Sequence, residues 1–132
     1  MGHGDTTSIA IPKRITTFKA NEKIVHAVAG AKHSIAMTQG NGILFSWGMG
    51  DQGRLGNGHE IGCLVPERIP MNGAGIPDGD DMSMYISTGE AHSAMVTANG
   101  NVYTWGVGSH GRQAQTHLKI SKLFISPTKK QY

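Results

Sequence analysis

Two glycine-rich segments of the chain have the spacing of a nucleotide-binding loop. Residues 48–53 read GMGDQG and residues 106–111 read GVGSHG, and both fit Gly-x-Gly-x-x-Gly. A dinucleotide site of this type needs a helix that begins at the third glycine, because the helix N-terminus binds the pyrophosphate. The sequence after Gly53 reads RLGNGHEIG, which is too rich in glycine for a helix. We therefore interpret both segments as structural turns.

Metal binding and nucleophilic catalysis also find little support. Four of the seven histidines show no ligand spacing, alone or with the single cysteine, Cys63: His26, His59, His110 and His117. Ser34 and Ser93 follow histidines, but no third residue is placed to orient a base. The sequence predicts no metal site, no cofactor and no enzyme.

The chain ends and the cysteine count suggest a location. Residues 1–6, MGHGDT, fit an N-myristoylation pattern, although they also fit the back end of a repeat. No run of about 18 apolar residues is present, so we expect no membrane contact. A single cysteine forms no internal disulfide, and we therefore expect an intracellular protein, nuclear or cytoplasmic.

An internal repeat dominates the sequence. Residues 24–58 and 84–112 share glycines, histidines and tryptophans in one order, at an offset of 59 that becomes 58 after the first turn. The recurring residues are Gly30 and Gly89, His33 and His92, Trp47 and Trp105, Gly48 and Gly106, Gly50 and Gly108, and Gly53 and Gly111. We expect the histidine rings to bond the backbone of an adjoining strand, and the tryptophans to pack between repeats.

Each repeat is expected to form short strands. Glycine supplies 19 of the 132 residues, which is about twice its usual share and typical of many turns. Asn-Gly turns at 41–42 and 99–100 predict two β-hairpins. The strands expected around them cover 24–29, 33–38, 43–47 and 64–69, and then 84–88, 92–97 and 101–105. The sequence predicts an all-β fold, a partial β-propeller of about two four-stranded antiparallel blades plus a stub of a preceding blade.

The repeat resembles that of the regulator of chromosome condensation family, through AGAKHSIAMTQGNGILFSWGMGDQGRLGNG, TGEAHSAMVTANGNVYTWGVGSHGR and the opening MGHGD. The resemblance implies a seven-bladed propeller, in a family that includes an exchange factor for the small GTPase Ran and several interaction platforms. The chain departs from the pattern at 113–115, where the Leu-Gly of the first repeat is lost, and in the long link 71–83. Two repeats do not close a seven-bladed ring, so we predict a piece of a larger propeller or a subunit completed by association.

Three regions follow from this interpretation. Residues 1–23 are expected to supply the last strand or strands of a preceding blade, 24–83 a complete repeat that ends in the link 71–83, and 84–132 a second, divergent repeat with a basic tail. The net charge of +3 is mild. Lysines near the C-terminus leave a nucleic-acid contact as an unfavoured alternative.

The resemblance implies a non-enzymatic protein-interaction module. The partner-binding candidates are residues of the Gly-x-x-His loops and of the acidic link: Ala31, Lys32, Glu90, Ala91, Asp78, Asp80 and Asp81. The alternative is guanine-nucleotide exchange on a Ran-type GTPase, an activity that would require most of a propeller. The expected partners are therefore a protein, which could be a small GTPase, and the rest of the propeller or a second copy.

Overall fold

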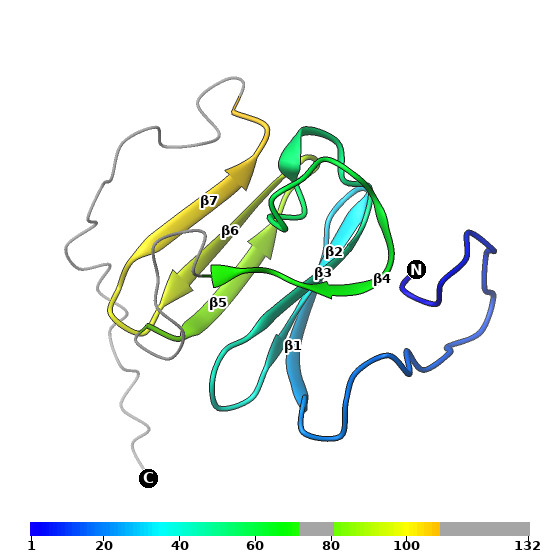
Figure 1. Cartoon of the computed structure of the whole chain (residues 1–132), viewed down its shortest axis with the longest axis horizontal. Helices are drawn as coiled ribbons and strands as arrows, with labels where there is room; N and C mark the ends of the chain where they lie inside the picture. Colours follow the sequence, from blue (N-terminus) through cyan, green and yellow to red (C-terminus); the bar gives the residue numbers. More distant parts are fainter. Residues whose placement is uncertain (72–80, 109–132) are drawn as a thin grey trace, which may run out of the picture.

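The computed structural model describes residues 1–71 and 81–108, which contain two antiparallel sheets (Figure 1). The first sheet has four strands in the order β1-β2-β3-β4: Ile24–Ala29, His33–Thr38, Leu44–Gly48 and Cys63–Arg68. The second has three in the order β5-β6-β7: Ser83–Thr88, His92–Thr97 and Val102–Gly106. The predicted all-β fold of propeller blades is confirmed. The expected fourth strand of the second blade lies outside the described residues.

The two sheets repeat each other in detail. In β1 the pairing with β2 shifts between Ile24 and His26, and in β5 the pairing with β6 shifts at the equivalent place, between Ser83 and Tyr85. The Asn-Gly hairpins join β2 to β3 and β6 to β7, as expected. The predicted repeat is therefore a structural repeat, down to the position of an irregularity in its first strand.

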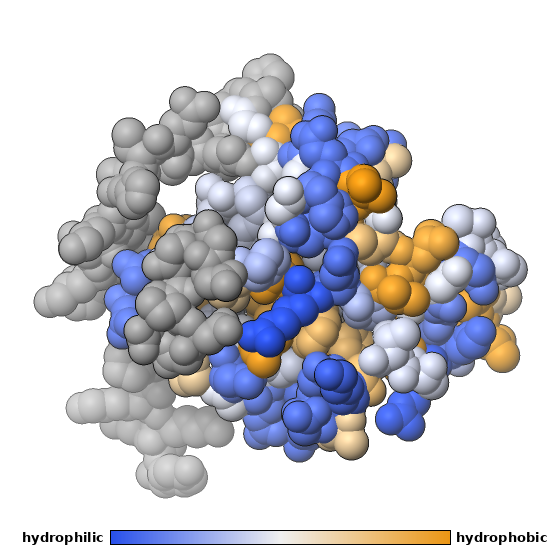
Figure 2. Space-filling model, in the orientation of Figure 1, coloured by the Kyte–Doolittle hydropathy of each residue, from blue (hydrophilic) through white to orange (hydrophobic). Residues whose placement is uncertain are grey.

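The core lies where the sheets face each other. β1 and β2 contact β5, so the two sheets adjoin through their first strands. Buried apolar side chains from both repeats fill the space between the sheets: Ile35, Met37, Leu44, Ile69, Ile86 and Met95. Further apolar side chains remain visible between the first sheet and the N-terminal segment (Figure 2).

Residues 1–23 correct one prediction, because they contain no strand. The segment 11–15 matches part of β4, which pairs with β3, but in this structure no strand lies beside 11–15 to pair with it. The repeat relationship still holds in packing. An added Cβ at Gly2 would lie 3.1 Å from Nε1 of Trp47, much as one at Gly56 would lie 2.6 Å from Nε1 of Trp105.

Helical structure is minor in this fold. The described residues contain the short 3₁₀ turn η1 (Asp51–Gly53), and none of their helices is long and apolar enough to cross a membrane.

Candidate functional site

The two Gly-x-x-His loops, residues 30–33 and 89–92, are in direct contact. They follow β1 and β5, and a Cβ added to Gly30 would lie only 2.4 Å from the carbonyl oxygen of Gly89. Ala31 is exposed, whereas Ala91 is buried, with 9% of its surface accessible. The side chains of Lys32 and Glu90 are exposed beside this contact. The loops predicted to bind a partner thus form one continuous surface, although Ala91 contributes little of it.

The histidine of each loop explains why the motif begins with glycine. The His33 ring lies against the Cα of Gly30, so that an added Cβ would stand 2.9 Å from its Cε1. In the second repeat, the corresponding distance from Gly89 to the His92 ring is 2.3 Å. Any larger residue would overlap the ring, so the spacing fixes an imidazole beneath the turn.

His33 connects the first sheet to the second. Its Nε2 lies 2.8 Å from the Ser93 hydroxyl, and that hydroxyl donates to the Arg54 carbonyl over 3.1 Å. Because the hydroxyl hydrogen is committed to the carbonyl, Nε2 of His33 carries its own hydrogen and donates. Trp105 Nε1 donates to the same carbonyl over 3.0 Å. One carbonyl of the first repeat therefore accepts two bonds from the second.

This arrangement corrects the expected partner of His33, which is a side chain of the next blade and not the backbone of an adjoining strand. Consecutive residues of a strand point to opposite faces. His33 therefore faces the second blade while Ser34 faces away from it. The same alternation turns Ser93 toward the first blade, and Ser93 pairs across the sheet with Trp105, so both donors share that face.

Arg54 was not among the predicted site residues. Arg54 is 6% exposed. Its guanidinium donates from Nε to the Asp51 carbonyl over 2.9 Å and from Nη1 to the Glu90 carbonyl over 3.4 Å. Arg54 thus anchors the backbone of the Glu90 loop and leaves the Glu90 carboxylate exposed. Its position directly after the glycine turn 48–53, seven residues beyond the repeat tryptophan Trp47, is the signal that could have identified it.

Burial lowers the pKa of His33 below 6.5, and the neighbouring charges of Arg54 and His92 lower it further. The other ring nitrogen, Nδ1, is buried and has no hydrogen-bond partner among the described residues. A proton there would add an unpaired charge beside a guanidinium. The site therefore holds His33 neutral.

We expect the stability of the chain to fall as the pH drops below about 6.5. Folding lowers the pKa of His33, so the unfolded chain binds a proton more readily than the folded chain. The contribution of His33 to the free energy of unfolding is therefore complete above the unfolded-state pKa and is lost at lower pH. The limiting slope of that free energy against pH is about 1.4 kcal/mol per pH unit. Urea unfolding between pH 7.5 and 5 measures this, and His33→Gln should flatten the slope while His26→Gln leaves it unchanged. An equal slope in wild type and His33→Gln would contradict the assignment.

The glycines that follow the tryptophans have a demanding backbone. Gly48 and Gly106 adopt φ values of 108° and 101°, a region that side chains avoid. An added Cβ would meet the backbone of the preceding loop, at 2.5 Å from the Lys32 oxygen and 2.4 Å from the Ala91 oxygen. The segment 48–53, which has the spacing of a nucleotide-binding loop, is thus a structural turn, as expected, and so is the described part of the segment 106–111. Gly50 precedes η1 and Gly53 is its last residue, Gly108 is the last described residue, and Gly111 lies outside the described residues.

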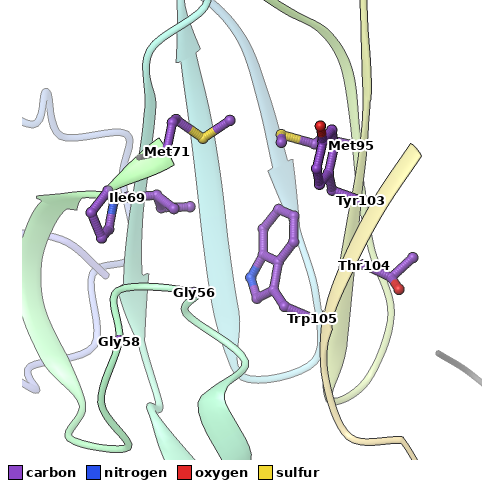
Figure 3. A pocket seen from close by; sticks show the side chains of 9 residues that line it. Gly56, Gly58, Ile69, Met71, Met95, Tyr103, Thr104 and Trp105 are labelled. Atoms are coloured by element: carbon purple, nitrogen blue, oxygen red, sulfur yellow. The ribbon is translucent and has the colours of Figure 1, made fainter. Parts of the chain in front are cut away.

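A hollow of about 250 Å³ lies between the two sheets beside this network. Trp105 extends into the hollow (Figure 3). Ile69 and Met71 line one side of its indole, and Met95 and Tyr103 line the other. Gly56 faces the indole. The lining is apolar, so this space is a packing seam between blades rather than a polar ligand site.

The acidic link has a structural role at its described end. Asp81 accepts from the Thr97 hydroxyl, from the Asn99 amide at 2.9 Å and from Asn101 Nδ2 at 2.8 Å. Partial desolvation raises the pKa of Asp81, but these donors outweigh it and lower the pKa below 3.8. Asp81 is thus engaged in holding the β6–β7 hairpin. The candidates Asp78 and Asp80 lie outside the described residues.

Two antiparallel sheets that join through their first strands and share one His-Ser-Trp network define a β-propeller repeat protein. Models of the regulator of chromosome condensation repeat match residues 1–37, 41–96 and, in a second form, 85–112. The chain belongs to this repeat family.

Curated relatives agree. The chain is 37% identical over 115 residues to the human E3 ubiquitin-protein ligase HERC2, covering 85% of this chain and 2% of the relative. It is 37% identical over 119 residues to the ultraviolet-B receptor UVR8 of Arabidopsis thaliana, covering 90% of this chain and 25% of the relative. The chain thus spans a quarter or less of the length of these relatives.

Solved structures show the same fold. Human WBSCR16 matches with a TM-score of 0.60 at 22% identity, over 76% of this chain and 25% of that one. Prp20p of Saccharomyces cerevisiae, which was studied together with its binding to Gsp1p and histones, matches with a TM-score of 0.53 at 25% identity, over 63% of this chain and 18% of that one.

Proposed function

We propose that this chain is a protein-binding segment of a β-propeller, and that the partner docks on the surface formed by loops 30–33 and 89–92. The contact between these loops at Gly30 and Gly89 is the observation that carries the proposal, because it joins two sequence-distant loops into one surface. Lys32 and Glu90 are the residues assigned to contact the partner.

The backbone of this surface is held in place from below. The Lys32 carbonyl accepts from the Met49 amide over 2.9 Å, and the Glu90 carbonyl accepts from Arg54. Within residues 1–71 and 81–108, neither Lys32 nor Glu90 takes part in a salt bridge. A rigid backbone with exposed opposite charges suits a protein surface of mixed charge, since little entropy is lost when it binds.

The hydrogen-bond network argues against nucleophilic catalysis. His33 and Ser93 form a histidine-serine pair, but Ser93 is fully buried. Its hydroxyl donates to a carbonyl and accepts from the imidazole, which is the reverse of the polarity that activates a nucleophile. The pair therefore fits a structural role.

Charge reversal tests the surface. We expect Lys32→Glu combined with Glu90→Lys to weaken capture of the physiological partner at least tenfold, because both contacts become repulsive. Lys13→Glu with Asp5→Lys is the matched control, since it reverses two exposed charges of the N-terminal segment, outside both loops, and keeps the same net charge. Quantitative mass spectrometry of captured proteins compares the three forms. A partner set unchanged by the loop reversal would overturn the proposal.

Guanine-nucleotide exchange on a Ran-type GTPase is the second candidate, and it rests on the structural similarity to Prp20p and that protein's binding to Gsp1p. The matched region is a minor part of Prp20p, so exchange would require the remainder of a ring. Release of labelled GDP from such a GTPase separates the candidates. Acceleration by this chain, abolished by the loop reversal, would support exchange, whereas GTPase-independent capture would support the binding module alone.

A further inference from the structure

An irregularity in β4 brings two of its residues together. Ser46 pairs with Glu67 and Gly48 pairs with Cys63, so that three β4 residues, 64–66, stand opposite the single residue Trp47. In a regular strand, residues four apart lie about 13 Å from each other. Here the bulge, which contains a proline, places the Cys63 sulfur 2.8 Å from Oε2 of Glu67. Bulges of this kind redirect side chains in binding sites.

A histidine completes the cluster. Nε2 of His59 lies 3.7 Å from the same Glu67 oxygen, and one ligand atom from each of His59, Cys63 and Glu67 lies within 4.8 Å of the others. Asn57 Nδ2 donates to Glu67 over 2.8 Å and holds that carboxylate in position. The backbone before Cys63 packs directly on Gly50, since an added Cβ at Gly50 would lie 2.2 Å from the Ile61 oxygen. This close packing holds the backbone in place.

We propose that His59, Cys63 and Glu67 bind a zinc ion, with water as the fourth ligand and Asn57 orienting the carboxylate. Imidazole, thiolate and carboxylate are the ligands that zinc takes in proteins, and three protein ligands leave one position open. The sequence expectation of no metal site considered only histidines with Cys63 and did not count Glu67. The spacing His59-x₃-Cys63-x₃-Glu67 becomes meaningful only with the bulge.

The geometry requires small movements. Tetrahedral zinc places its ligand atoms about 3.3–3.6 Å apart, so the Cys63 sulfur moves away from Glu67 by less than an ångström and the His59 ring moves inward. The side chains of His59 and Glu67 are 40% and 48% exposed, which leaves them room to adjust. The loop before Cys63 packs closely on Gly50, and this packing keeps the three ligand atoms near one another during these movements.

The protons balance without a further reactant. Zinc replaces the thiol hydrogen that now bonds Glu67, and that proton goes to solvent; zinc stays divalent. His59 Nδ1 at present accepts from the Ile61 amide over 3.2 Å. When Nε2 binds zinc, the ring proton moves to Nδ1, which donates to water. Metal binding should therefore release the Ile61 amide from this bond.

Cobalt(II) and zinc titrations of the full chain test the site. Because Cys63 is the sole cysteine, thiolate-to-cobalt charge-transfer absorption reports on this cluster alone. We expect one cobalt per chain, displaced by zinc, with the Ile61 amide shifted in NMR spectra. Cys63→Ser should abolish the charge-transfer band, and His59→Ala and Glu67→Gln should weaken zinc binding at least tenfold.

Two controls keep the result decisive. His26→Ala removes an exposed histidine of β1 and should leave binding unchanged, while Asn57→Ala should weaken it about tenfold through loss of carboxylate orientation. Circular dichroism of each metal-free variant verifies the fold. Absence of a charge-transfer band in folded wild type, or zinc affinity equal in wild type and Cys63→Ser, would overturn the site while leaving the partner-binding proposal untouched.

Discussion

Replacing Trp105 with alanine should lower the free energy of unfolding by about 3 kcal/mol. The indole extends into the hollow between the sheets, packs on Gly56 and donates to the Arg54 carbonyl over 3.0 Å. Its removal enlarges a cavity and leaves one donor fewer on that carbonyl. The value is at the low end for tryptophan because the side chain is only half-buried. Urea unfolding at pH 7.5 measures it.

Trp105→Phe separates the two contributions. Phenylalanine keeps most of the packing but has no N–H, so we expect a loss of about 1 kcal/mol from the hydrogen bond, plus a smaller packing term. A cost below 1 kcal/mol for the alanine variant would show that the indole does not hold the two blades together.

Gly30→Ala should destabilise the chain by about 2–3 kcal/mol. The new methyl group would meet the Gly89 carbonyl at 2.4 Å and the His33 ring at 2.9 Å. The first contact is with backbone, which cannot rotate away, so relief requires the two loops to separate. The same movement would stretch the His33–Ser93 bond, and NMR shifts should therefore appear in both loops.

Gly53→Ala is the matched control, because its added methyl group strains the backbone but meets no neighbouring atom. Gly53 has an unfavourable φ of 70° for a side chain, yet an added Cβ meets nothing within 4 Å. We expect a loss of about 1 kcal/mol from backbone strain alone. If Gly30→Ala cost no more than Gly53→Ala, the close contact of the loops would be wrong.

The strands were predictable because their signals are local. Asn-Gly turns and alternating residues around them located both hairpins to within a residue or so, and the expected strand 24–29 coincides with β1. The repeat offset also identified the residues of the network as equivalent. These features need no knowledge of how the blades are arranged.

The contacts between blades were not predictable in the same way. Which residue meets His33 depends on how one sheet lies against the next, and the serine that accepts its hydrogen is 60 positions away. The sequence shows Asp81 only as one residue of an acidic link, and its bonds to the β6–β7 hairpin depend on how that hairpin folds back beside it. Cys63 and Glu67 meet only because the bulge shortens the path between them. Residues 1–23 contain no strand although part of the segment matches β4, because a strand needs a neighbour to pair with and no local signal shows whether one is present.

The two proposals concern different parts of the molecule. The loop surface with Lys32 and Glu90 follows β1 and β5, whereas the proposed zinc site combines Cys63 and Glu67 of β4, the last strand of the first sheet, with His59 of the loop before it. Only the first depends on the network through His33, so variants of that network discriminate between them. Zinc binding should survive Ser93→Ala.

A double-mutant cycle on His33 and Ser93 tests the central claim most directly, namely that this hydrogen bond couples one blade to the next. With His33→Leu, Ser93→Ala and the combined variant, we expect an interaction free energy of about 1–3 kcal/mol in urea unfolding. The pair His26→Ala and Ser93→Ala should be additive to within about 0.5 kcal/mol, since His26 is exposed on β1. Additivity of the His33 and Ser93 substitutions to the same tolerance would contradict the account.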